Sequence, residues 1–326
     1  MFALALALVL PVSPAPEPER VRAAVSAALK PLAAGATGHA EQKSCFACHN
    51  QAPALLAFRT ATDRGFDVPA ALYKAQAEHI AAFAETNREK FKDGRGTGGA
   101  AATASYLLFS LELAGYKPDE NTDAVVGYLL NTQPNNDHWR TTSNRPPTEA
   151  SDFTTTYLAL RALRVWGTHA KLDATKVKAR TEKARAWLVK ANAKDNEDCA
   201  FRLLALKEAG AEPRDVQSAA WELLKAQRAD GGWAQLDSGT SDAYATGSAL
   251  VALHDAGGMK PDAPAYRAGL AFLLGAQKKD GTWFVKTRSK PFQPYYESGF
   301  PYEKDQFISA AASGWAAAAL ARAVEK

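Results

Sequence analysis

Apolar residues recur with the period of an α-helix along most of the chain, in segments separated by short polar or glycine-containing stretches. No segment shows sustained alternation of apolar and polar residues, so we expect almost no β-strand. The pattern predicts twelve helices in six pairs. The first helices of the pairs are expected near residues 18–34, 69–92, 119–132, 173–193, 213–228 and 263–278. The second helices are expected near 44–64, 98–115, 152–166, 198–209, 242–256 and 305–324.

Two recurring features show that these pairs are repeats of one unit. A Gln followed six residues later by Trp closes three of the first helices, and the pairs are Gln133 with Trp139, Gln227 with Trp233, and Gln277 with Trp283. A glycine follows five of the second helices, as expected of a helix C-cap. These glycines are Gly65, Gly115, Gly167, Gly210 and Gly257.

The two helices of a pair differ in composition. The second helices are rich in Ala, Gly, Ser and Thr, whereas the first helices carry charged faces. Helices that are apolar or small on all sides are surrounded by protein. We therefore predict an all-α fold, an (α/α)6 toroid of six helix pairs, with the second helices inside. Residues 16–326 are expected to form this single domain.

From about residue 40 to its end, the chain resembles the terpenoid cyclase and protein prenyltransferase toroid family. The Gln-x5-Trp segments are similar to the QW repeats of squalene-hopene cyclases. The resemblance implies that their Gln and Trp residues brace one helix pair against the next. It also implies an apolar, isoprenoid-like small molecule that is bound or cyclised.

The catalytic motifs of that family are not matched. The chain has no DxDD, and its nearest string is Asp195-Asn196-Glu197-Asp198 at the start of a second helix. Crowded carboxylates there can raise one pKa, but acids are also favoured in the first turn of a helix. We expect N-capping rather than an acid catalyst. A zinc-binding triad of prenyltransferase type is not expected either, because Asp198 and Cys199 are adjacent and His254 lies at the far end of its helix.

The strongest chemical motif is Cys45-Phe46-Ala47-Cys48-His49. C-x-x-C-H is the attachment signature of a c-type haem, in which two thiols form thioethers and the adjacent histidine binds iron. We predict one covalent haem c on Cys45 and Cys48, with His49 as the proximal metal ligand. A disulfide or redox pair, and a zinc site, remain alternatives.

The position of this motif predicts a site at one mouth of the toroid. The motif is expected at the start of the first inner helix, on the face that carries the long loops 133–150 and 280–304. Long loops on a rigid scaffold often hold binding residues. The candidate pocket consists of Asp152, Asp242, Asp305, Trp139, Tyr295, Tyr296 and Glu297, although each Asp is also expected to be an N-cap.

The sixth position of the iron has three candidates. His138 lies in the long loop at the same mouth and ranks first, an open position ranks second, and His39 ranks third. Met259 follows the helix-ending Gly257 and is expected on the opposite face.

The remaining features bear on location and partners. Residues 1–15 contain an apolar run followed by small residues, which is typical of a signal peptide and predicts a periplasmic or secreted protein. The run is too short to span a membrane, and no later segment is long and apolar enough. The formal net charge is +4, with basic residues spread along the chain, so nucleic acid is not an expected partner. Cys199 is left unpaired.

The leading hypothesis is a haem c toroid that acts in electron transfer, with a redox partner protein, or in redox chemistry on a ligand in its cavity. The first alternative is a cyclase-like or prenyltransferase-like protein for an apolar isoprenoid-like molecule. The second is a non-catalytic binding toroid with a Cys45–Cys48 disulfide. The sequence leaves open whether the protein is an enzyme.

Overall fold

The computed structural model describes residues 16–291 and 294–326. These residues form thirteen α-helices and one short 3₁₀ helix, and they contain no β-strand beyond two isolated bridges. The all-α prediction is therefore confirmed. The helices are α1 (Pro18–Gln42), α2 (Ala52–Asp63), α3 (Ala70–Thr86), α4 (Arg88–Lys92), α5 (Ala100–Leu113), α6 (Glu120–Asn131), α7 (Asp152–Trp166), α8 (Ala174–Lys190), α9 (Asn196–Glu208), α10 (Pro213–Lys225), α11 (Ala243–Asp255), α12 (Pro264–Ala276), η1 (Glu303–Asp305) and α13 (Gln306–Arg322).

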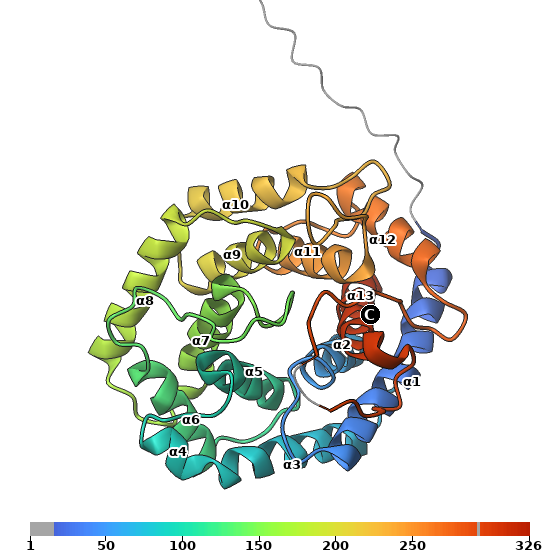
Figure 1. Cartoon of the computed structure of the whole chain (residues 1–326). Coiled ribbons are helices and arrows are strands. Elements are labelled where there is room, and N and C mark those ends of the chain that lie inside the picture. The colour runs from blue at the N-terminus through green and yellow to red at the C-terminus, as the bar shows by residue number, and fades with distance from the viewer. Residues whose placement is uncertain (1–15, 292–293) are drawn as a thin grey trace, which may run out of the picture.

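The helices form two concentric rings (Figure 1). The inner ring consists of α2, α5, α7, α9, α11 and α13, and the outer ring of α1, α3 with α4, α6, α8, α10 and α12. The last inner helix, α13, packs against both α1 and α2, which joins the two ends of the chain and closes the ring. The toroid predicted from the helix pairs is the observed architecture.

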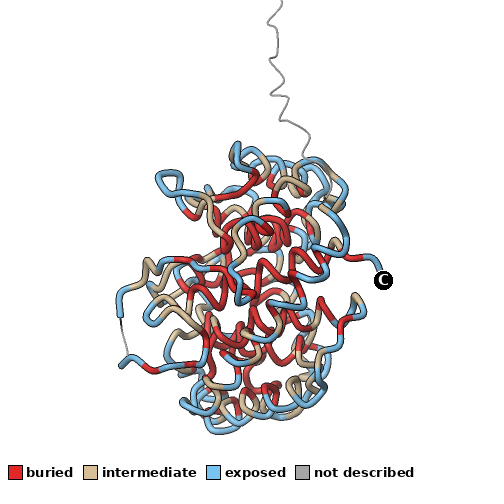
Figure 2. The backbone as a smooth tube through the Cα atoms, turned by 90° about the vertical axis from the view of Figure 1, so that its right-hand side faces the viewer, coloured by how far each residue is buried: buried red, intermediate tan, exposed pale blue. Residues whose placement is uncertain are grey.

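Small residues allow the inner helices to approach each other closely. A Cβ atom added to Gly314 of α13 would lie 2.5 Å from the carbonyl oxygen of Pro53 in α2. One added to Gly247 of α11 would lie 2.7 Å from the backbone nitrogen of Ala316. Both distances are shorter than a carbon can tolerate, so only glycine fits. Buried residues accordingly gather in the middle of the molecule (Figure 2).

The three tryptophans of the Gln-x5-Trp segments are buried and make the same two contacts in each repeat. The indole nitrogens of Trp139, Trp233 and Trp283 donate hydrogen bonds to the carbonyls of Leu129, Leu223 and Leu273 at 2.7–2.8 Å. Their backbone nitrogens donate to hydroxyls of the following inner helix, on Thr156, Thr246 and Ser313. Each tryptophan thus connects an outer helix, a loop and an inner helix.

The glutamines make less uniform contacts. Gln227 donates to the carbonyl of Ala265 in α12 at 2.8 Å, and Gln277 donates to that of Ala24 in α1 at 2.9 Å, so each reaches the next outer helix. Gln133 instead bonds with the backbone of Arg140 in its own loop. There, Arg180 of α8 spans the gap by donating to the carbonyls of Thr132 and Asn136.

Several helix boundaries differ from those predicted. The first inner helix begins at Ala52 rather than near residue 44, so the C-x-x-C-H motif lies in the turn before the helix and not at its start. The helix expected over 69–92 divides at Asn87, whose side-chain amide donates to the carbonyl of Phe83 four residues back. Such local side-chain bonds compete with helix continuation.

The helix-ending glycines are only partly as expected. Gly65, Gly115 and Gly210 have the positive φ of a helix C-cap. Gly167 has a φ of −63°, and at the fifth position Gly258, not Gly257, has the positive φ.

The predicted signal peptide, residues 1–15, lies outside the described residues. None of the described helices is long and apolar enough to cross a membrane.

We expect replacement of Trp233 or Trp283 by Ala to lower the free energy of unfolding by about 3–5 kcal/mol, because each change removes a large, fully buried ring. Trp221→Ala is the matched control, since this side chain is 58% exposed. Urea unfolding measures the difference. Equal losses for the buried and the exposed tryptophans would contradict the structural role.

Candidate functional site at the mouth of the toroid

A cavity of about 410 Å³ opens at the face where the inner helices begin. Its wall comes from three parts of the chain. These are the turn before α2, the loop before α7, and the loop before α13 together with the first turn of that helix. The residues that line it include His49, Arg145, Pro146, Glu149, Phe307 and Ile308. A cavity of this size is typical of a small-molecule site.

The turn that carries the C-x-x-C-H motif is held by hydrogen bonds from both sides. The Gln51 side chain accepts from the backbone nitrogen of Ala47 at 3.0 Å and donates to Gln76 of α3 at 2.8 Å. His39 of α1 bonds through Nε2 to the carbonyl of Cys45 at 2.7 Å, and its Nδ1 lies 2.6 Å from the Tyr296 hydroxyl. A carbonyl can only accept, so Nε2 donates and Nδ1 accepts the tyrosine proton.

His49 presents a neutral imidazole to the cavity. Burial is the main cause that lowers the pKa of His49 to about 3, and the positive charge of Arg145 adds to it. Its ring lies edge-on to Phe307 with centroids 4.9 Å apart. Its Nε2 atom is buried and has no hydrogen-bond partner among the described residues. A neutral imidazole with a free nitrogen is the form that binds a metal ion.

Cys48 and Glu149 form a buried pair beside His49. The Cys48 thiol donates to Oε1 of Glu149 at 2.9 Å, and only 2% of Glu149 is exposed. Arg145 forms an ion pair with the same carboxylate. Burial, together with the Glu149 charge, raises the pKa of Cys48 well above its usual value, so the thiol stays protonated. Cys45 is exposed, and Cys45, Cys48 and Cys199 are all free thiols.

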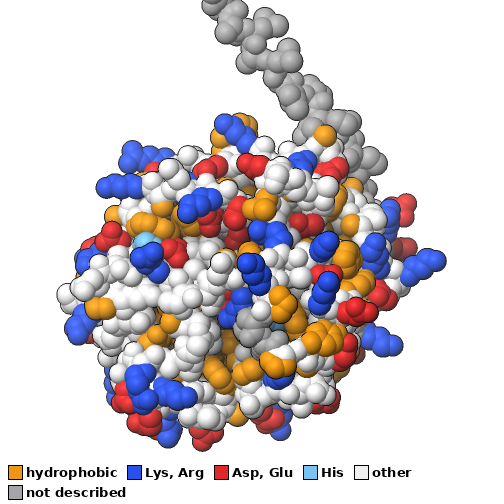
Figure 3. All heavy atoms as spheres, viewed as in Figure 1, with side chains coloured by type: hydrophobic (Ala, Val, Ile, Leu, Met, Phe, Trp, Pro, Cys, Tyr) orange, Lys and Arg blue, Asp and Glu red, His pale blue; other side chains and the backbone are white. Residues whose placement is uncertain are grey.

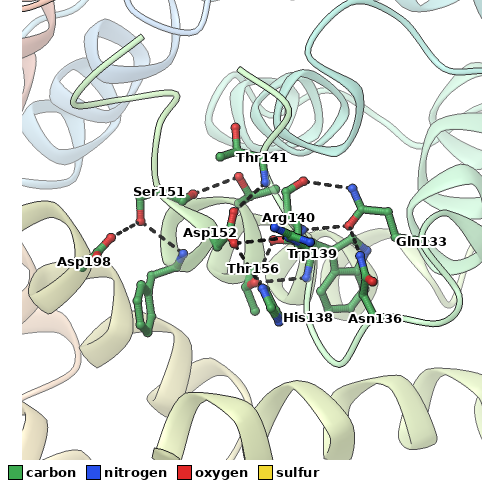
Figure 4. Close-up of polar contacts among 12 residues, drawn as sticks. Gln133, Asn136, His138, Trp139, Arg140, Thr141, Ser151, Asp152, Thr156 and Asp198 are labelled. Carbon is green, nitrogen blue, oxygen red and sulfur yellow. Dashed lines mark hydrogen bonds and ion pairs between the residues drawn. The ribbon is translucent and has the colours of Figure 1, made fainter. Parts of the chain in front are cut away.

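The structure does not bring His138 to this cavity. Its ring stacks on Trp187 of the outer helix α8, with centroids 3.8 Å apart. Its Nε2 atom lies 3.2 Å from Oδ2 of Asp152. Figure 4 shows Asp152 between His138 and the backbone nitrogen of Thr141, which donates to Asp152 at 2.8 Å. Burial alone would raise the pKa of Asp152, but these bonds outweigh it and lower the pKa. His39, which ranked third as a sixth ligand, lies nearer to His49.

Two of the seven predicted pocket residues, Tyr295 and Asp305, line the cavity. Asp242 caps α11 as expected and borders a second, shallower cavity. Asp152 is not the cap of α7, because Ser151 takes that role, and Asp305 makes no side-chain cap bond to α13. Trp139 is fully buried, Tyr296 is bonded to His39, and Glu297 is an exposed partner of Tyr295.

The acids at the start of α9 do not line this cavity. Asp195 is the N-cap and accepts from the backbone nitrogen of Asp198 at 3.0 Å. Glu197 is buried and accepts from the hydroxyls of Thr154 and Tyr244 at 2.8 and 3.0 Å. Burial and the charges of Asp195 and Asp198 raise the pKa of Glu197 well above its usual value. Glu197 therefore keeps its proton to a higher pH than an exposed glutamate, but it is not among the residues lining the mouth cavity.

The sequence patterns missed several residues that form the site. Glu149, Phe307 and Ile308 carry no motif, and the three lysines Lys286, Lys290 and Lys304 resemble any other surface lysine in sequence. One available signal was the long loop 133–150, which contains both Arg145 and its partner Glu149. No group of three or more His, Cys, Asp or Glu side chains in the described ranges is arranged to hold a metal ion.

No protein-family model and no curated protein matches this sequence. Solved structures of the type II terpene cyclase MstE from Scytonema share its fold. A variant in complex with the substrate geranylgeranyl dihydroxybenzoate has a TM-score of 0.61 at 14% identity, covering 95% of this chain and 98% of that one. The apo enzyme has a TM-score of 0.57 at 14% identity, covering 94% and 99%. At this identity, the likeness establishes the terpene cyclase-like fold alone.

The buried acid gives a pH-dependent stability that can be measured. Above about pH 4.3, the unfolded chain releases the Glu197 proton while the folded protein keeps it. The free energy of unfolding therefore falls as pH rises, by up to about 1.4 kcal/mol per pH unit until the folded pKa is reached. Glu197→Gln mimics the protonated acid and should flatten the fall between pH 4.5 and 8. Urea unfolding across this range tests it, with the exposed Glu41→Gln as control. An unchanged slope in Glu197→Gln would refute the buried-acid assignment.

Proposed function

We propose that the protein carries one haem c at the mouth of its toroid, attached through Cys45 and Cys48 and ligated by His49. The observation that carries this proposal is at His49, which lines the cavity and whose Nε2 atom is buried and unpaired among the described residues. A buried polar atom without a partner is costly, so such an atom in a cavity supports a missing ligand.

Several features around His49 support the haem proposal, although neither Cys45 nor Cys48 is among the residues lining the cavity. Both thiols of the motif are free, and both side-chain polar atoms of the adjacent Asn50 are also buried without a partner among the described residues. Pro146, Phe307 and Ile308 provide an apolar wall for a macrocycle. Thioether formation would remove the Cys48 proton that Glu149 now accepts, and Arg145 would remain to pair with this carboxylate.

In this proposal, haem supplies one-electron redox chemistry. The chain holds the His49 ring in place through Phe307 and through the bonds of Gln51 and His39 to the motif turn. Burial keeps the imidazole neutral, and the apolar wall excludes water from one side of the site. Electron exchange with a redox partner protein at this exposed mouth is the activity that we propose, in a periplasmic or secreted setting.

The contacts of His138 and His39 do not favour either of them as a second histidine ligand. His138 is stacked on Trp187, and both ring nitrogens of His39 are already bonded.

A second candidate function is binding of an apolar small molecule, and the fold comparison favours it. MstE, which shares the fold, is solved with a geranylgeranyl dihydroxybenzoate bound. The apolar wall of the mouth cavity is compatible with such a ligand. Cyclisation itself has less support, because the chain lacks DxDD and because Glu197, the buried acid with the raised pKa, does not line this cavity.

We expect the chain produced in a host that matures c-type cytochromes to have an intact mass increased by one haem, and to keep it under denaturing conditions. Cys45→Ala with Cys48→Ala should abolish the mass increase, while Cys199→Ala should not. His49→Ala should change the visible spectrum. A mass equal to that of the bare mature chain would defeat the haem proposal and leave apolar-ligand binding as the better function.

We expect His138→Ala to leave the visible spectrum of the haem protein unchanged, and the reduced protein to bind carbon monoxide readily. The physical reason is that His138 is held at the outer ring by Trp187 and Asp152. His39→Ala serves as the comparison. Loss of a low-spin spectrum in His138→Ala alone would show that the loop moves His138 to the iron.

A further inference from the structure

The mouth cavity has an unbalanced charge. Four basic side chains line it, Arg145, Lys286, Lys290 and Lys304, against two acidic ones, Glu149 and Asp305. Glu149 is already paired with Arg145. Asp305 accepts a hydrogen bond from the backbone nitrogen of Thr287 at 2.8 Å.

Asp305 is the one acidic side chain of the lining left to offset the charge of the three lysines, so a net positive charge remains. None of them forms an ion pair with another residue in the part of the chain that the structure describes. All three are exposed, and they come from two segments of the loop before α13. Figure 3 looks onto this face and shows Lys and Arg side chains around hydrophobic ones near its centre.

This arrangement combines an apolar wall with a basic rim. Phe307, Ile308 and Pro146 can contact an apolar body, while lysines beside them attract negative charge. A purely apolar ligand would gain nothing from these lysines, and a small inorganic anion would gain nothing from the wall.

We propose that the cavity selects ligands that carry carboxylates on an apolar body, and that Lys286, Lys290 and Lys304 bind those carboxylates. This inference rests on the proposed function for its ligand: the carboxylates are the propionates of an attached haem, or the acid group of a free apolar ligand. In both cases the lysines would bind a carboxylate, and experiments can separate the two sources.

The first experiment uses the full chain produced without haem-attachment machinery, in which the thiols are free. The probes are haemin with its dimethyl ester, and palmitate with methyl palmitate, followed by tryptophan fluorescence and calorimetry. We expect each acid to bind about tenfold more tightly than its ester, the effect of a few exposed ion pairs. The triple change Lys286→Gln, Lys290→Gln and Lys304→Gln should bring this ratio close to one.

The control variant removes the same number of positive charges from a surface away from the cavity. Lys178, Lys190 and Lys207 are exposed, lie on the outer part of α8 or the end of α9, and do not line the cavity. Their replacement by Gln should leave the preference for acids unchanged. Equal affinity for acid and ester in the parent protein, or an unchanged preference in the triple variant of the mouth, would overturn the inference.

The second experiment separates this inference from the haem proposal. In haem-loaded protein, the triple variant of the mouth should have a lower midpoint reduction potential than the parent, because the propionates lose their positive neighbours, and the control variant should match the parent. Attached haem with no such shift and no preference for acids would refute the inference and leave the haem function intact. A chain that never attaches haem but prefers acids would refute the haem function and support a free carboxylate ligand.

Discussion

The buried indole hydrogen bond of each Gln-x5-Trp segment is the interaction on which the rest of the toroid depends. In three repeats, the tryptophan ring donates to the last turn of an outer helix, and its backbone nitrogen donates to a hydroxyl on the following inner helix. Because a buried N–H group without a partner is costly, these bonds restrict the loop to one placement. In these three repeats, the bonds fix where the outer helix ends and where the inner helix begins.

This constraint explains why residues far apart in sequence meet at one mouth. The tryptophans anchor the beginning of the loops before α7 and α13, and both loops then extend over the same face as the turn before α2. Cys48 can therefore reach Glu149, and His49 can lie against Phe307. Further along the last loop, Gln306 fixes its path by bonding to the backbone of Tyr296 and Ser298. The site is assembled by loops, but the loops are held by the scaffold.

The sequence was sufficient for the architecture because helical periodicity and the repeats act locally. Periodicity and repeats were enough to locate all six inner helices. The largest error among them is at the first, which begins at Ala52 because the Gln51 side chain accepts a hydrogen bond from the backbone nitrogen of Ala47 in the preceding turn. The Gln51 side chain is also held by a hydrogen bond to Gln76 of α3, a contact that the local sequence pattern does not reveal. The site was harder for the same reason. Ranking His138 first assumed that sharing a mouth means pointing inward, whereas stacking on Trp187 turns it toward the outer ring. Glu149 has no recognisable motif, and only the fold brings it to Cys48.

The fold and the chemistry of this protein are separate questions. The likeness to MstE covers nearly the whole chain, yet identity is 14%, so the shared scaffold carries no catalytic residue across. The buried polar atoms that lack a hydrogen-bond partner give more specific information about a ligand than the shared fold does. Among the described residues, eleven buried side-chain atoms lack a hydrogen-bond partner, and three of them belong to His49 and Asn50, directly after the second cysteine of the motif. Folding strongly disfavours such atoms, and a well-packed turn held by Gln51 and His39 has no local reason to leave them unpaired. A ligand bound in the adjoining cavity, which His49 lines, is the partner that the proposed function would supply.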